Sequence, residues 1–209
     1  MTVSSVSSRS VRITPQQERS ERRLARFLDA AAELFAKLGF EPTTMQAIAD
    51  CSGSSIGALY NYFPDKQSVA ETLRNQYSQQ LRVRLQKLSK ESQQLSGAQF
   101  AEAFIDCIVT FAEERPAWLN LHVAPVQVGR DQTARTALRR SIAGAFRRKN
   151  PSLLPARALL AANVTLQILK AMRSLYVDSD ATGKDEVAQE FRKVLTQYLE
   201  SVLAEGRTG

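Results

Sequence analysis

Apolar residues recur at helical spacing along almost the whole chain, whereas the alternating pattern of a strand is rare. The clearest case spans residues 18–39, where one apolar face is formed by Leu24, Phe27, Leu28, Ala31, Leu34, Phe35 and Leu38. Gly39 follows this face and is suited to cap the end of the helix. The pattern predicts an all-α protein with about nine helices.

Proline, glycine and polar breaks divide the rest of the chain into helices. Pro64 is expected to start a long fourth helix that runs to about Ser89. Five more helices are expected over residues 97–114, 116–128, 131–149, 153–177 and 183–205. These boundaries predict a flexible basic arm over residues 1–16, a three-helix unit over residues 17–64 and a larger helical body over residues 65–209.

Two short apolar segments flank a tight break within residues 43–63. Thr43 and Thr44 are good caps for the first short helix, and Ser54 or Ser55 for the second. Gly53 stands where the chain must turn and tolerates a positive φ. The small core between the two helices would come from Ala47, Ile48, Ile56 and Leu59, with a contribution from Tyr60. Together with the longer helix before them, these two helices predict a helix-turn-helix.

The second short helix would present small and polar side chains, which suits the major groove of DNA. Serine and asparagine can bond base edges or phosphates, and small residues allow close approach. Tyr60, Tyr62 and Lys66 would reach the DNA backbone from the helix end and the start of the next helix. The alternative is a corner of an ordinary all-α protein, in which the aromatic residues only pack.

The segment TTMQAIADCSGSSIGALYNYFPDK is similar to the DNA-binding signature of the tetracycline-repressor (TetR) family. The matching positions are Thr44, Ile48, Ala49, Gly53, Ser55, Gly57, Leu59, Tyr60, Tyr62, Phe63 and Lys66. Residues 31–40 also resemble the family's first helix, so the close likeness covers about the first third of the chain. Three positions depart from the family pattern, where Ser54 replaces a small apolar residue, Ile56 a frequent lysine and Asn61 a frequent histidine.

The resemblance implies that Thr44, Tyr60, Tyr62 and Lys66 hold the DNA backbone while residues 54–61 face the groove. Six arginines outweigh two glutamates within residues 1–26, which favours salt-dependent DNA binding. Arg9 and Arg12 are as well explained by a solvated tail as by a minor-groove contact. The expected DNA contacts are therefore Thr43, Thr44, Ser54, Ser55, Ile56, Gly57, Ala58, Tyr60, Asn61, Tyr62, Lys66, Arg19, Arg22 and Arg23.

The last two helices carry more apolar residues than one buried face requires. In the family these helices pair with their copies, so the resemblance implies a homodimer that binds a palindromic operator. It also implies a cavity for a small-molecule ligand within residues 100–176. The candidate lining residues are Phe104, Ile108, Phe111, Trp118, His122, Asn163, Gln167 and Tyr176. For each of them, simple core packing is the alternative role.

Composition limits the other classes of function. One histidine, two cysteines and no phosphate-binding loop leave little for acid-base, metal or cofactor chemistry, so we expect no enzyme, no cofactor and no metal site. No secretory signal or membrane-spanning run is evident, which favours the cytoplasm. The expected function is a sequence-specific transcriptional regulator, a repressor released by a ligand. The net charge of +7 leaves an alternative, a helical adaptor or membrane-surface protein without specific DNA readout.

Overall fold

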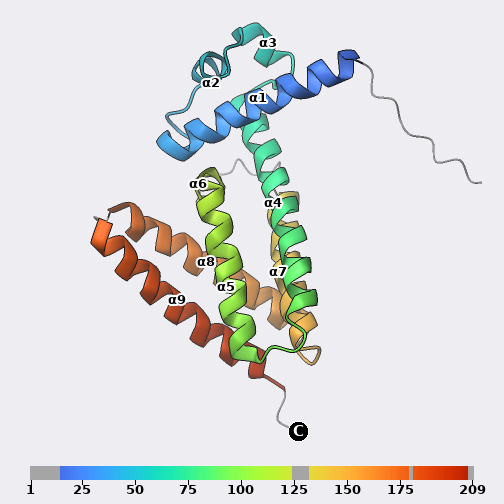
Figure 1. Ribbon diagram of the computed structural model, residues 1–209, viewed down its shortest axis with the longest axis vertical. Coiled ribbons are helices and arrows are strands. Elements are labelled where there is room, and N and C mark those ends of the chain that lie inside the picture. Colours follow the sequence, from blue (N-terminus) through green and yellow to red (C-terminus); the bar gives the residue numbers. More distant parts are fainter. Residues whose placement is uncertain (1–14, 124–131, 179–180, 207–209) are drawn as a thin grey trace, which may run out of the picture.

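The computed structural model describes residues 15–123, 132–178 and 181–206, and within these residues the secondary structure is entirely helical (Figure 1). The helices are α1 (Pro15–Leu38), α2 (Met45–Cys51), α3 (Ile56–Tyr60), α4 (Lys66–Glu91), α5 (Gly97–Glu114), α6 (Pro116–Val123), α7 (Gln132–Lys149), α8 (Pro155–Asp178) and α9 (Ala181–Ala204). The all-α prediction is therefore confirmed, and so is the count of about nine helices over the described residues.

One predicted helix start is wrong. α4 begins at Lys66, and Pro64 precedes the cap instead of occupying the first helical position. The cap is Asp65, whose carboxylate accepts a hydrogen bond from the Ser68 amide at 2.7 Å, while the Ser68 hydroxyl faces the Asp65 amide at 3.4 Å. This capping box satisfies two amides at once, an advantage that a proline at the first position cannot supply.

The three N-terminal helices share one core. Phe27, Ala31 and Phe35 on α1 are fully buried together with Ile48 on α2 and Leu59 on α3. Tyr60 does not belong to this core, because half of its surface (50%) is exposed, and Leu38 also faces solvent. The apolar face of α1 therefore ends one turn earlier than the sequence pattern indicates.

The body is a bundle in which α4 packs on α7, α7 on α8, and α9 on both α5 and α8. α4 runs from the N-terminal unit along the length of the body (Figure 1). Aromatic pairs fill its interior, with Phe111 at 5.3 Å from Trp118 and 6.4 Å from Tyr77 between ring centroids. Since Tyr77 belongs to α4 and Trp118 to α6, this cluster connects three helices of the body.

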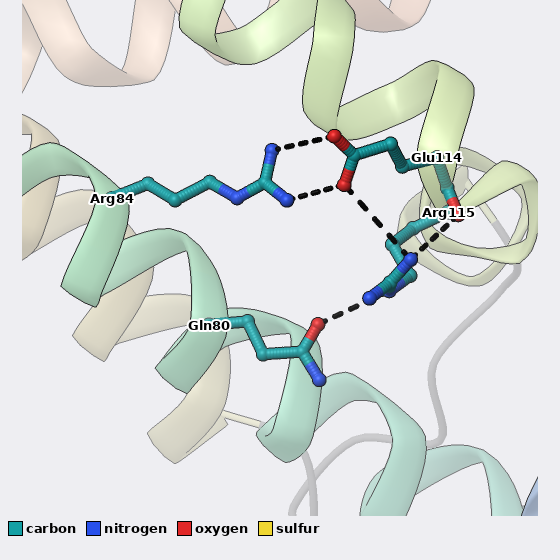
Figure 2. A network of polar contacts seen from close by, with 4 residues as sticks. All are labelled: Gln80, Arg84, Glu114 and Arg115. Carbon is teal, nitrogen blue, oxygen red and sulfur yellow. Dashed lines mark hydrogen bonds and ion pairs between the residues drawn. The ribbon is translucent and has the colours of Figure 1, made fainter.

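A polar network ties α4 to the corner between α5 and α6 (Figure 2). Both terminal nitrogens of Arg84 donate to the carboxylate of Glu114, which forms an ion pair with it. Arg115 donates to the side-chain oxygen of Gln80 at 3.2 Å and to the Glu114 carbonyl at 2.9 Å. The hydrogen bonds from Arg84, with its positive charge, lower the pKa of Glu114 below its usual 4.5.

We expect Arg84→Gln to destabilise the protein slightly at neutral pH, because it removes an ion pair that is partly solvated. The Glu114 carboxylate, whose pKa is lowered, contributes stability above pH 4.5 and loses it as the pH falls through the lowered pKa. The difference between the two proteins should therefore shrink on acidification. Urea unfolding at pH 7 and at pH 3 measures it, and an undiminished difference at pH 3 would contradict this role of Glu114.

Candidate nucleic-acid interface

Local hydrogen bonds cap the starts of α2 and α3. The Thr44 hydroxyl accepts from the Ala47 amide at 3.1 Å and caps α2, while the Ser55 hydroxyl accepts from the Ala58 amide at 3.2 Å and caps α3. Gly53 between them has a φ of +64°, the left-handed conformation that favours glycine. Each of these contacts spans a few residues of chain, which explains why the sequence alone predicts this turn.

One side of α3 is buried in the N-terminal unit, and the other side is exposed to solvent. Leu59 is fully buried and Phe63 is nearly so, whereas Ser55, Gly57, Tyr60 and Asn61 are exposed. The other predicted groove residues, Ser54, Ile56 and Ala58, are half-buried. The structure therefore gathers the predicted groove-facing set on the short helix α3 and its flanks, with Ser55, Gly57 and Asn61 outward.

Gly57 is exposed and has open space around it. A Cβ atom added at Gly57 would meet nothing within 4 Å, and its φ is not in the left-handed region. Neither the packing of this chain nor its backbone conformation therefore requires a glycine at this position. A close approach by an outside surface, such as the wall of a DNA groove, is a physical reason for a residue without a side chain.

Thr43 must be removed from the expected DNA contacts. It is 1% exposed, and its hydroxyl donates to the Gly39 carbonyl at 2.7 Å. This bond closes the turn between α1 and α2, and it leaves no hydroxyl hydrogen for a phosphate. The neighbouring Thr44 remains exposed while its hydroxyl oxygen caps α2.

Lys66 and Tyr62 have roles inside the protein that the sequence did not reveal. The Lys66 ammonium donates to the carbonyls of Phe40 at 2.7 Å and Glu41 at 2.9 Å, and it lies 4.4 Å from the centroid of the Phe40 ring. The Tyr62 hydroxyl is 2.9 Å from the hydroxyl of Ser20, and its ring packs edge-on against Phe27. Lys66 therefore ties the start of α4 to the turn after α1, and Tyr62 ties the segment after α3 to α1 itself.

The three arginines predicted on α1 lie on its exposed surface. Arg19, Arg22 and Arg23 are all exposed, and Arg22 pairs with Glu18 at 3.7 Å across one helical turn. Arg9 and Arg12 lie outside the described residues. The exposed arginines leave positive charge on the same unit that carries α3.

A small cavity of about 30 Å³ lies between α6, α7 and α8. Three of the predicted ligand contacts line it, namely Trp118, Asn163 and Gln167. Phe104, Ile108 and Phe111 do not, since they are buried in the core of the body, and the side chains of His122 and Tyr176 lie outside the described residues. The sequence missed the remaining lining residues, which are Leu119, Leu138, Arg139, Leu166, Leu169 and Lys170.

Apolar side chains remain uncovered on the last two helices. Leu160 on α8 is 54% exposed and Val194 on α9 is 48% exposed, and Leu159 lies beside Leu160 in the sequence and is also exposed. Leu195 and Leu199, also on α9, are buried within the chain itself. The part of the chain that the structure describes contains no helix able to span a membrane and no group of residues able to hold a metal ion.

The helix-turn-helix and the helical body define a class of protein, a regulator that binds DNA through its N-terminal unit. The family model "Bacterial regulatory proteins, tetR family" matches residues 27–73, and the model "Tetracyclin repressor-like, C-terminal domain" matches residues 98–199. The chain therefore belongs to the TetR family of transcriptional regulators.

Individual relatives agree with this assignment. The chain is 25% identical over 190 residues to the HTH-type transcriptional regulator BetI of Cronobacter sakazakii, covering 87% of this chain and 91% of that protein. It is 41% identical over 51 residues to the HTH-type transcriptional repressor KstR2 of Rhodococcus jostii, covering 24% of this chain and 25% of the repressor. The crystal structure of a TetR-family regulator from Streptomyces coelicolor matches with a TM-score of 0.64 at 18% identity, covering 86% and 99% of the two chains.

We expect Gly57→Ala to fold normally. Its free energy of unfolding should rise by up to about 1 kcal/mol, because alanine is the better helix former. The same change should lower the affinity for the cognate duplex about tenfold or more, since a methyl group would hold α3 away from the bases. Thermal melting and DNA-binding titrations measure the two effects. Gln86→Leu, an exposed change on α4, is the control. Unchanged DNA affinity in Gly57→Ala would show that α3 does not approach DNA at this residue.

Proposed function

We propose that the chain acts as a homodimeric repressor that binds a palindromic operator and is released by a small-molecule ligand. The observation that carries the proposal is the exposed face of α3, with Ser55, Gly57 and Asn61 outward on a helix anchored by Leu59. In this proposal residues 17–64 form the DNA-binding domain and residues 65–209 the ligand-binding and dimerisation domain. As a reader of bacterial operators, the protein would work in the cytoplasm.

The proposed DNA contacts fall into two groups. Ser54, Ser55, Gly57, Ala58 and Asn61, together with Ile56, would face the major groove. Thr44, Tyr60, Tyr62 and Lys66 would hold the phosphates, with Arg19, Arg22 and Arg23 adding charge. Tyr60 is the best placed of the phosphate group, because half of its surface is exposed, whereas the hydroxyl of Tyr62 and the ammonium of Lys66 already bond within the chain.

Dimerisation through α8 and α9 would cover the apolar side chains of Leu159, Leu160 and Val194. It would also place two copies of α3 at half-sites separated by one helical turn of DNA, about 34 Å. Joining two weak half-site contacts can raise affinity by about 10²–10⁴-fold without any new contact to DNA. A single short helix therefore becomes a specific reader only as part of a pair.

The cavity between α6, α7 and α8 is the proposed ligand site. Its apolar lining, which includes Trp118, Leu138 and Leu166, suits an apolar ligand body. The side-chain oxygen of Asn163 is buried without a hydrogen-bond partner, and Arg139 adds a positive charge, so a polar or anionic group on the ligand would be stabilised there. With about 30 Å³ the cavity has room for one or two water molecules, so a ligand would have to move the helices around it.

The first experiment is selection of bound duplexes from a random DNA pool at near-physiological salt. We expect a palindrome that is lost in Tyr60→Ala and retained in the surface control Gln86→Leu. Recovery of no common sequence would contradict the repressor proposal. Stronger binding to anionic vesicles than to any duplex would favour the alternative, a membrane-surface protein.

The dimer face has its own test. Leu160→Glu should give a monomer by analytical ultracentrifugation and weaken operator binding by about 10²-fold or more, because avidity between the half-sites is lost. Val83→Glu is the matched control, since Val83 is equally exposed at 55% but lies on α4, away from α8 and α9. A Leu160→Glu protein that remains dimeric would place the interface elsewhere.

The ligand step is tested by screening small carboxylic acids and neutral apolar compounds for release of the operator complex. Arg139→Gln should raise the concentration of the acids needed to release DNA at least several-fold, because it removes a charge at the cavity. Release of DNA by neutral compounds should stay unchanged. Failure of every compound to release DNA would argue against an inducible repressor.

A further inference from the structure

α6 is the element of the body that meets the end of α1. The two helices pack together, and α6 lies at the end of the body beside α1 (Figure 1). Asn120 on α6 is 8% exposed, and its side-chain nitrogen donates to the carbonyls of Phe35 at 2.6 Å and Ala36 at 3.0 Å. One buried carboxamide therefore joins the body to the last turn of the first helix.

The position of these carbonyls explains why the contact matters. The last four carbonyls of an α-helix have no partner within the helix, and Phe35 and Ala36 belong to the last four residues of α1. The Gly39 amide also donates to the Phe35 carbonyl, at 3.1 Å. Asn120 completes the cap from a position 85 residues later in the chain than Phe35. Loss of its amide would leave buried carbonyl groups with fewer donors.

The same end of α1 carries the helix-turn-helix. The turn from Gly39 to Thr43 connects it to α2, and Thr43 and Lys66 fix that turn by donating to the carbonyls of Gly39, Phe40 and Glu41. Any rotation of the end of α1 against α6 would therefore move α2 and α3 together as one unit. The two hydrogen bonds of Asn120 join α6 to this unit.

From this geometry we infer that Asn120 is a positioning residue, which fixes the direction of α3 relative to the body and thereby the half-site spacing that the dimer accepts. The inference rests on the proposed function, since spacing has meaning only for two copies on one operator. Each base pair added to the spacer increases the distance between the half-sites by about 3.4 Å. A small rotation at the end of α1 therefore changes which spacer length fits the dimer. Asn120 directly follows Trp118 and Leu119, which line the cavity. The residue proposed to set the spacing and two residues of the cavity therefore lie on the same helix.

The test uses the full-length protein and the half-site recovered from the random pool. Duplexes carry two half-sites with the selected spacer, with spacers shorter and longer by one or two base pairs, or a single half-site. Asn120→Leu keeps the branching and the number of side-chain heavy atoms and removes both donors, and Asn120→Asp places a carboxylate against the two carbonyls. The control is Arg84→Gln, which breaks a polar contact within the body and does not touch α1.

Both Asn120 variants should lose spacer selectivity, and the ratio of affinities for the best and neighbouring spacers should fall about 5- to 30-fold. The affinity for a single half-site and the recovered half-site sequence should stay unchanged, a combination that general destabilisation would not produce. Asn120→Ala replaces the leucine variant if thermal melting shows that it does not fold.

Three results would overturn the inference, and they differ in what else they affect. Unchanged spacer selectivity in the Asn120 variants refutes the role of Asn120 and leaves the repressor proposal intact. An equal loss of selectivity in Arg84→Gln shows that any weakening of the body has this effect. A wild-type protein that selects no paired half-sites refutes the repressor proposal, and with it the spacing role of Asn120.

Discussion

The end of α1 is the point on which the rest of the structure depends. Five carbonyls of this helix and its following turn, those of Phe35, Ala36, Gly39, Phe40 and Glu41, accept hydrogen bonds from side chains. The bond to the Phe35 carbonyl is buried, and a buried carbonyl without a partner costs about 1–3 kcal/mol, so a donor at this position stabilises the fold. Thr43 supplies one donor from the turn itself, and Asn120 on α6 and Lys66 on α4 supply the others, which attaches the DNA-binding unit to the body.

α4 links the two units because its start contacts the DNA-binding unit and its middle contacts the body. Its first residue, Lys66, bonds to the turn after α1, and its middle section joins the aromatic cluster through Tyr77 and the polar network through Arg84. Figure 2 shows that this network reaches the corner from which α6 begins. The network therefore ties the middle of α4 to the corner at which α5 ends.

The candidate site shows where prediction from the sequence succeeds and where it fails. The caps by Thr44 and Ser55 and the turn at Gly53 were predictable, because each is a contact within a few residues. The burial of Thr43 and the internal bonds of Lys66 were not, because their partners are carbonyls of a turn whose shape depends on other elements. Asn120, Arg139 and Lys170 carry no pattern in the sequence that separates them from ordinary surface residues.

By itself the sequence determined the helices, the helix-turn-helix and the likeness to one family of regulators. Periodicity, caps and turns are local patterns, so a short stretch of sequence is enough to recognise them. Tertiary structure alone decided which polar groups remain available to a partner, since a hydroxyl or an ammonium is free only if no carbonyl lies within reach. It also decided that Phe104, Ile108 and Phe111 fill the core while Trp118 and Asn163 line the cavity, because helical spacing gives each residue a face but not the element that covers it.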